Sequence, residues 1–135
     1  MTMEILDVVA LSPLQRGLYS VSTLSGEVDP YLVTFAMRVE NLPDIDALHE
    51  AFDRLLDRYP HLGGAVSAED VPHPVLVITS EGQLGWREID LRDAVDPEHA
   101  ATDLYWSEAR TRIDLDHGPL MRVVAARVGD KDYEL

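Results

Sequence analysis

The chain first shows helical periodicity directly after Ser12-Pro13. Apolar residues then recur on one helical face, at positions 14, 18 and 21. Ser12 can cap such a helix, Pro13 fits its first position, and Gln15 stands where a capping box requires it. Glycine tolerates the left-handed conformation that often ends a helix, so Ser25-Gly26 is expected to end this helix. The pattern therefore predicts a capped helix over about residues 13–25.

Two later stretches repeat this pattern. Asp44 can cap a second helix, which carries apolar residues at helical spacing and stops at Pro60. Asp96 can cap a third helix with proline at its first position, and the apolar spacing of this helix fades near Arg112. We therefore expect two further helices, which end close to Tyr59 and to Arg112.

Other stretches are rich in residues that favour β-strands. Residues 31–39 are apolar on both faces of the strand that they would form, which predicts a strand covered from both sides. Further strands are expected over residues 74–79, 84–89 and 120–128, and a last one begins at Asp132. The order α-β-α-β-β-α-β-β predicts an α+β fold, a two-layer lobe with helices packed on a mainly antiparallel sheet.

Composition narrows the functional classes. The chain has 135 residues, 46% of them hydrophobic, which is enough for the core of one domain. A net charge of −14 would repel phosphate groups, so we expect neither nucleic acid nor a membrane as partner. The absence of cysteine excludes disulfides and thiolate chemistry, which suits a cytoplasmic protein. Five widely spaced histidines predict no metal site.

Three short blocks carry the functional signal. The first opens the first predicted helix and reads Leu11-Ser12-Pro13-Leu14-Gln15-Arg16-Gly17-Leu18-Tyr19. The second ends the second helix and reads Leu55-Leu56-Asp57-Arg58-Tyr59-Pro60-His61-Leu62-Gly63-Gly64-Ala65-Val66. The third, the most specific, reads Ile113-Asp114-Leu115-Asp116-His117-Gly118-Pro119-Leu120-Met121-Arg122. In order and spacing the blocks resemble motifs of the condensation domains of nonribosomal peptide synthetases.

The resemblance extends to individual positions of the first block. The family motif S-x-A-Q-x-R-(L/M)-(W/Y) is matched at Ser12, Gln15, Arg16 and Tyr19, with Gly17 inserted before the last two motif positions. Sequences of the form L-(S/T)-P-L-Q-x-G-L within the same family fit even better. A capped amphipathic helix alone would also give part of this pattern, so the block is informative mainly beside the other two.

The second block matches the family only in part. The motif R-H-(E/P)-x-L-R-T-x-F is matched at Arg58, Pro60 and Leu62, but Gly63 stands where the family carries an arginine. In the family this arginine is thought to pair with the aspartate of the active-site motif H-H-x-x-x-D-G. Removing one partner of a buried ion pair is costly, so we expect the parent domain to depart from ordinary condensation domains here.

The resemblance implies a chloramphenicol acetyltransferase-like fold, in which two lobes form a V around a tunnel. Residues 1–135 would be the N-terminal lobe, cut just before H-H-x-x-x-D-G. In the complete domain, peptidyl carrier proteins deliver donor and acceptor on phosphopantetheine arms, and the acceptor amine attacks the donor thioester. The second histidine of the motif positions or deprotonates that amine. We therefore expect no catalytic residue, directly bound cofactor or metal in this chain.

The resemblance also implies partners. Residues at the end of the first helix help dock the acceptor carrier protein in this family, and Ser20 and Leu24 stand at those positions. Alternatively, Leu24 only completes the apolar face of its own helix. The missing C-terminal lobe is a second expected partner. An open edge at the shortened last strand and an uncovered apolar face would make the fragment self-associate.

Two other functions remain open. A condensation-like domain can lose catalysis and recruit a partner protein such as an oxygenase, and the glycine at position 63 is in keeping with such a loss. A related acyltransferase could instead form an ester with a hydroxyl group. An intact or a degenerate active-site motif in the parent sequence would separate catalysis from recruitment.

Overall fold

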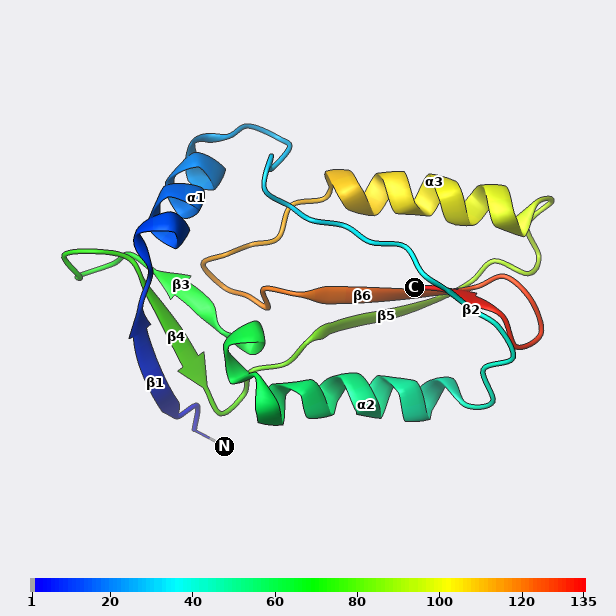
Figure 1. Cartoon of the computed structure of the whole chain (residues 1–135), viewed down its shortest axis with the longest axis horizontal. Coiled ribbons are helices and arrows are strands. Elements are labelled where there is room, and N and C mark those ends of the chain that lie inside the picture. The colour runs from blue at the N-terminus through cyan, green and yellow to red at the C-terminus, as the bar shows by residue number, and fades with distance from the viewer. Residues whose placement is uncertain (1) are drawn as a thin grey trace.

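The computed structural model describes residues 2–135, and Figure 1 shows how its helices and strands are arranged. The first half of the chain forms β1 (Ile5–Ala10), α1 (Pro13–Leu24), β2 (Arg38–Val39), α2 (Ile45–Arg58), the 3-10 helix η1 (Pro60–Gly63) and β3 (Ala65–Ser67). The second half forms β4 (Val75–Thr79), β5 (Gly85–Asp90), α3 (Pro97–Arg110), β6 (Arg122–Arg127) and β7 (Tyr133–Glu134).

The three predicted α-helices are confirmed, and aspartates cap two of them. Asp44 accepts hydrogen bonds from the backbone N–H groups of Asp46 at 3.0 Å and Ala47 at 3.3 Å. Asp96 accepts one from the N–H of His99 at 3.1 Å. N–H groups in the first turn have no partner within their own helix, so each aspartate fixes the point at which its helix begins.

The strands form two sheets. One has the order β1-β4-β3 and the other β2-β7-β6-β5. Four of the five strand pairings are antiparallel, whereas β5 and β6 are parallel. A parallel pair needs a long crossover connection, and α3 supplies it. The predicted α+β class with mainly antiparallel pairing is confirmed, although the strands divide between two sheets.

The four-stranded sheet carries one helix on each face. Successive side chains of a strand point to opposite faces. On β5, Trp86 stacks on His49 of α2 with ring centroids 4.3 Å apart, whereas its neighbour Arg87 forms an ion pair with Glu108 of α3. Figure 1 accordingly shows α2 and α3 on opposite sides of β5 and β6. This part of the molecule therefore has three layers, α2, the sheet and α3, where two layers were predicted.

The core has one part in each sheet. In the three-stranded sheet, Val66, Leu76 and Ile78 form a buried cluster. In the four-stranded sheet, Ala125 is fully buried and Ala126 is only 2% exposed. Because β6 is covered from both sides, its apolar residues are almost continuous and do not alternate with polar ones.

The expected strand over residues 31–39 is largely wrong. Only Arg38–Val39 form a strand, paired with β7, and backbone hydrogen bonds between Met37 and Leu135 lengthen this pairing by one position. Residues 32–37 form neither helix nor strand, and Phe35 is 83% exposed. The composition of this segment suits a buried strand. Its partner strand β7 is only two residues long, however, and within the described residues no element covers Phe35.

Two strands that were not predicted, β1 and β3, pair with β4. All six residues of β1 are exposed, including several large apolar ones. The last strand, β7, lies between β2 and β6. The expectation of an open edge at the last strand is therefore wrong, and β1 is the long exposed edge instead.

Candidate functional site

Ser12 and Gln15 of the first block form a reciprocal capping box at the start of α1. The N–H of Gln15 donates to Ser12 Oγ at 3.1 Å, and the N–H of Ser12 donates to Gln15 Oε1 at 2.8 Å. Each side chain therefore satisfies a backbone donor of the other residue. In the described chain these two motif positions fix where α1 begins.

Tyr19 connects the first block to the third. Its hydroxyl donates to Oδ1 of Asp116 at 2.8 Å, although the two residues are 97 positions apart in the sequence. Its ring packs against the buried cluster of Val66, Leu76 and Ile78. Burial and, to a smaller degree, the Asp116 carboxylate raise the pKa of Tyr19 above its ordinary value. The phenol therefore stays protonated at neutral pH and continues to donate this hydrogen bond.

Backbone hydrogen bonds join the second block to the third. The N–H of Leu120 donates to the carbonyl oxygen of Leu62 at 3.1 Å, and the N–H of Val66 donates to that of Leu115 at 2.7 Å. Together with the Tyr19 hydroxyl, these contacts bring all three motif blocks to one part of the molecule.

A tight turn shapes the third block. Asp114 accepts hydrogen bonds from the N–H groups of Asp116 at 3.0 Å and His117 at 3.2 Å, and its other carboxylate oxygen lies 2.8 Å from His117 Nδ1. The contact with the His117 ring, followed by these backbone donors, lowers the pKa of Asp114. Gly118 has a φ of +66°, and an added Cβ would collide with the Gly64 carbonyl oxygen. Only glycine fits this position without strain.

Gly63 lies against Gly82, in the loop between β4 and β5. A Cβ added at Gly63 would lie 3.1 Å from the carbonyl carbon of Gly82 and 3.2 Å from the nitrogen of Gln83. The arginine that the resemblance places here therefore does not fit unless this loop moves. Arg58, the nearest cation of the block in sequence, donates from Nε to the hydroxyl of its neighbour Tyr59 at 3.2 Å.

Arg122, the last residue of the third block, holds the C-terminal end of α3. Its Nε lies 3.0 Å from the Glu108 carboxylate, and its terminal nitrogens donate to the backbone oxygens of Glu108, Thr111 and Arg112. Carbonyl groups in the last turn have no partner within the helix, and the helix dipole favours a cation there. The sequence gives no local signal for this contact, because Arg122 stands 12 residues after the end of α3 at Arg110.

The expected docking positions lie on an exposed part of α1. Leu24 is 88% exposed, and Leu14 and Val21, which share the apolar face of this helix, are 71% and 41% exposed. Leu24 could still complete this apolar face of its own helix, so the exposure leaves both interpretations of Leu24 open. Ser20 is also exposed, but its hydroxyl donates to the carbonyl oxygen of Arg16 at 2.9 Å within the same helix. Of the two docking positions, Leu24 is thus more available for contact with a partner, because the Ser20 hydroxyl is already hydrogen-bonded.

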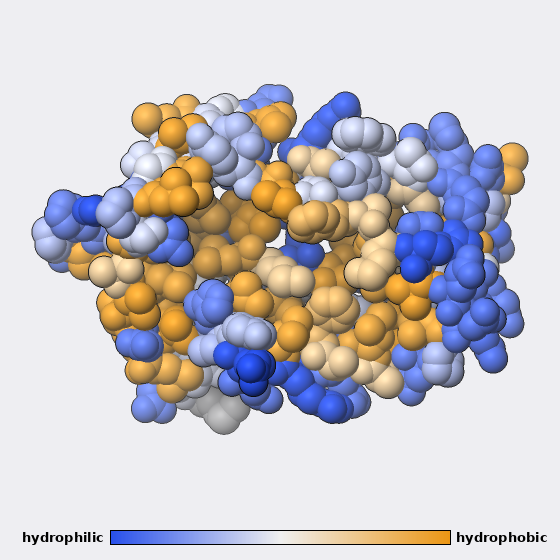
Figure 2. Space-filling model, viewed as in Figure 1, coloured by the Kyte–Doolittle hydropathy of each residue, from blue (hydrophilic) through white to orange (hydrophobic). Residues whose placement is uncertain are grey.

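A hollow of about 820 Å³ opens between residues 32–37, α3 and β6. Its wall is mainly apolar, and Leu62 of the second block and Leu120 of the third contribute to it. The face of the molecule shown in Figure 2 has apolar residues around an indentation in its middle, whereas charged residues dominate one end. The hollow is therefore bordered by the same blocks that carry the resemblance.

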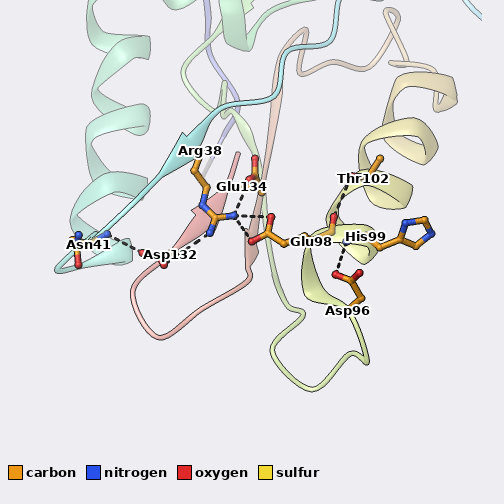
Figure 3. A network of polar contacts seen from close by, with 8 residues as sticks. All are labelled: Arg38, Asn41, Asp96, Glu98, His99, Thr102, Asp132 and Glu134. Atoms are coloured by element: carbon orange, nitrogen blue, oxygen red, sulfur yellow. Dashed lines mark hydrogen bonds and ion pairs between the residues drawn. The ribbon is translucent and has the colours of Figure 1, made fainter.

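Arg38 forms an ionic network beside this hollow (Figure 3). Its guanidinium lies 2.7 Å from Glu98 of α3, 3.0 Å from Glu134 of β7 and 3.9 Å from Asp132. Hydrogen bonds to Glu98 and then to Glu134 raise the pKa of Arg38 well above its usual range. The N–H of Asn41 also donates to Asp132, at 3.0 Å. The network thus ties β2, α3 and β7 together.

The described residues, 2–135, carry neither a cluster of metal ligands nor a membrane-spanning helix. Within that range no three histidine, aspartate or glutamate side chains come together as metal ligands would. None of the helices in the same range is both long enough and apolar enough to cross a bilayer.

Comparison with known proteins gives one family and a consistent group of relatives. The condensation domain family matches residues 5–135. Gramicidin S synthase 2 of Brevibacillus brevis is 28% identical over 131 residues, which are 96% of this chain and 3% of that protein. Malpibaldin synthetase of Mortierella alpina is 30% identical over 123 residues, which are 91% of this chain and 2% of that protein. The chain thus spans only a small share of these relatives.

Solved structures share the fold. The starter condensation domain of rhizomide synthetase superposes with a TM-score of 0.82 at 18% identity, covering 95% of this chain and 31% of that one. A four-domain nonribosomal peptide synthetase bound to AMP and glycine superposes with a TM-score of 0.81 at 20% identity, covering 99% of this chain and 10% of that one.

Proposed function

The chain belongs to the condensation domain family, and we propose that residues 1–135 form the N-terminal lobe of a domain that makes peptide bonds. In the proposed reaction the acceptor amine attacks the carbonyl carbon of the donor thioester. The new C–N bond forms, the C–S bond breaks, and the leaving thiolate receives the proton that the nitrogen loses. The sequence of these 135 residues contains no H-H-x-x-x-D-G. In this proposal the complete domain supplies that motif, and its second histidine binds the attacking nitrogen.

The observation that best supports this proposal is the convergence of the three motif blocks. Tyr19 bonds to Asp116, and Leu62 bonds to Leu120, so segments of distant sequence become one unit. The contacts found at Ser12, Gln15, Tyr19, Leu62 and Gly63 are structural, which fits a lobe that supports an active site and does not itself perform the chemistry.

The proposed partners follow from the same reaction. Peptidyl carrier proteins would present donor and acceptor on phosphopantetheine arms, and the C-terminal lobe would close the tunnel. We propose that the acceptor carrier protein docks on α1 around Ser20 and Leu24, because Leu24 is 88% exposed. Replacing Leu24 by aspartate in the complete domain should then raise KM for the acceptor carrier protein and leave kcat nearly unchanged. A cytoplasmic setting, without nucleic acid or membrane, suits these partners and the charge of −14.

A reconstitution experiment tests the proposed function. The complete domain and the 135-residue chain are each mixed with donor-loaded and acceptor-loaded carrier proteins, and dipeptidyl product on the acceptor is measured by mass spectrometry. We expect product with the complete domain and only background with the 135-residue chain. Product from the short chain at a rate near that of the complete domain, or none from a complete domain with an intact H-H-x-x-x-D-G, would contradict the proposal.

One observation favours a second function, recruitment of a partner protein by a domain without catalysis. Gly63 replaces the arginine of the family motif, and a side chain at that position would require the Gly82 loop to shift. A domain that has given up the active-site loop geometry would tolerate this change. If the reconstitution gives no product while the complete domain retains a protein partner on affinity capture with defined candidates such as an oxygenase, recruitment becomes the better account.

A further inference from the structure

Arg112, in the segment after α3, binds the last turn of α1. Its Nη2 donates to the carbonyl oxygen of Ser22 at 2.6 Å, and its Nη1 donates to that of Gly26 at 2.8 Å. Carbonyl groups at the end of a helix have no partner within the helix, and the rigid fork of a guanidinium can bind several of them at once. One side chain from distant sequence thus fixes both the last turn of α1 and the start of the loop that follows.

Ser22 connects this contact to a third group, the carboxylate of Asp29. The Ser22 hydroxyl donates to Asp29 Oδ2 at 2.5 Å and lies 3.3 Å from Arg112 Nη2. Of the residues of α1, all of which the structure describes, only Ser22 is buried, at 3% exposure. The guanidinium, the hydroxyl and the carboxylate therefore form one partly buried group on the inner side of α1.

The proposed docking positions lie on the outer side of the same turn. With 3.6 residues per turn, Ser20 and Leu24 share a helical face roughly opposite the one that carries Tyr19 and Ser22. Leu24 is 88% exposed, whereas Tyr19 and Ser22 contact the rest of the lobe through Asp116 and Arg112. A shift of Ser22 therefore shifts Leu24 as well, because the two lie in one helical turn.

We propose that Arg112 is a positioning residue for the acceptor carrier protein. It sets the place and angle of the last turn of α1, and so the place of Leu24 in the docking surface, without touching the carrier protein itself. Tyr19 bonds to Asp116 one turn earlier, so the loss of Arg112 frees the end of α1 while the middle of the helix stays attached. This inference rests on the proposed docking of the carrier protein on α1.

The dissociation constant of the complete domain for the acceptor carrier protein of the same synthetase tests this role. We expect Arg112→Met to weaken binding at least about fivefold, as do the more important residues of an interface. Arg112→Lys should recover part of the lost affinity, because an ammonium group can still donate to a carbonyl oxygen at the end of α1. Leu24→Asp, which alters the docking surface directly, is measured beside them.

A control separates positioning from a general loss of stability. Val128 is buried just after β6, at the end of that strand that lies away from α1 in Figure 1. Val128→Ala should destabilise the domain by leaving a cavity and should leave the dissociation constant unchanged. All variants are compared at a temperature at which circular dichroism shows each of them folded. Weaker binding by Val128→Ala of the same size as by Arg112→Met would overturn the proposal, because lost stability would then explain both.

The pair of Arg112→Met and Leu24→Asp separates this inference from the docking proposal beneath it. Unchanged binding by Arg112→Met beside weakened binding by Leu24→Asp would overturn the role of Arg112 and leave the docking surface in place. Unchanged binding by both variants would overturn docking on α1 and the role of Arg112 with it. Binding of the carrier protein does not require condensation, so the result is independent of whether the reconstitution yields product.

Discussion

Arg112 holds the C-terminal end of α1 through Ser22, a residue 90 positions away. Its Nη2 donates to the carbonyl oxygen of Ser22 at 2.6 Å, and Ser22 is only 3% exposed. The same guanidinium reaches the carbonyl oxygen of Gly26 at 2.8 Å. Since α1 has no basic residue in its own last turn, the cation that its dipole favours comes from the loop after α3.

Replacing Arg112 by methionine should destabilise the chain by about 1–3 kcal/mol, because the carbonyl group of the buried Ser22 loses a charged donor. The free energy of unfolding in urea measures this. Arg110→Met is the control, since Arg110 is exposed and lies only two positions earlier. Hydrogen exchange at Ser25 should also quicken in the Arg112 variant, because its N–H bonds to the last turn of α1. Equal stability of the two variants would contradict this role.

Adding a side chain at Gly63 should destabilise the fold. Gly63→Ala forces a Cβ to within 3.1 Å of the Gly82 backbone, and overpacking of this kind costs about 1–3 kcal/mol. Gly63→Arg should cost at least as much. Gly26→Ala serves as the control, because nothing lies within 4 Å of its added Cβ. Thermal unfolding of the three variants gives the comparison, and a Gly63→Arg chain that melts above the parent would show that the loop yields and the arginine finds a partner.

The helices could be predicted because their signals are local. Ser12 and Gln15 are three residues apart, and Asp44 and Asp96 directly precede the helices that they cap. Strand pairing depends on distant segments, so β1 was missed even though the apolar run that ends at Ala10 stands just before the Ser12 cap. The strand predicted over residues 31–37 is absent because β-forming side chains alone do not supply a partner strand.

The three motif blocks of the candidate site could be found in the sequence, but the contacts between them could not. Nothing in the sequence pairs Tyr19 with Asp116 or directs Arg122 to the end of α3, because such contacts arise only when the sheets have formed. The parallel pairing of β5 with β6 had a usable signal, a strand-helix-strand order, which was not interpreted as a crossover.

Alkaline pH should weaken the link between the first and third blocks. The pKa of Tyr19 is raised in the folded chain, so the folded state holds this proton more tightly than the unfolded state. The resulting stability is fully present below the ordinary tyrosine pKa of about 10 and is lost as the pH rises through the folded value. Tyr19→Phe should therefore be less stable than the parent at neutral pH, with a difference that shrinks above about pH 10.

Urea unfolding of the parent chain and of Tyr19→Phe at a series of pH values measures the difference in their free energies of unfolding. Tyr31→Phe, at a tyrosine that is 49% exposed, is the control. A Tyr19 difference that stays constant into the alkaline range would show that the Asp116 contact does not depend on the phenol proton.

The 135-residue chain should self-associate through β1. This strand lies at the edge of its sheet and exposes Ile5, Leu6, Val8 and Val9, between 42% and 58% each. Edge strands of this kind pair with other chains, and a lysine on the edge prevents it. Val8→Lys should shift sedimentation toward the monomer, whereas Val95→Lys, at an exposed loop position, should not. A parent chain that sediments as a monomer at tens of micromolar would contradict this.

The pairing of β2 with β7 constrains how the polypeptide can fold as the ribosome makes it. Arg38 bonds to Glu134, 96 residues later. Translation adds about 5–20 residues per second, so the N-terminal strand waits on the order of 5–20 seconds for its partner to emerge. During that interval Val33, Phe35 and Met37 precede a strand with nothing to pair with. Nascent chains of this domain should therefore bind chaperones that recognise apolar segments until residues near position 134 leave the exit tunnel.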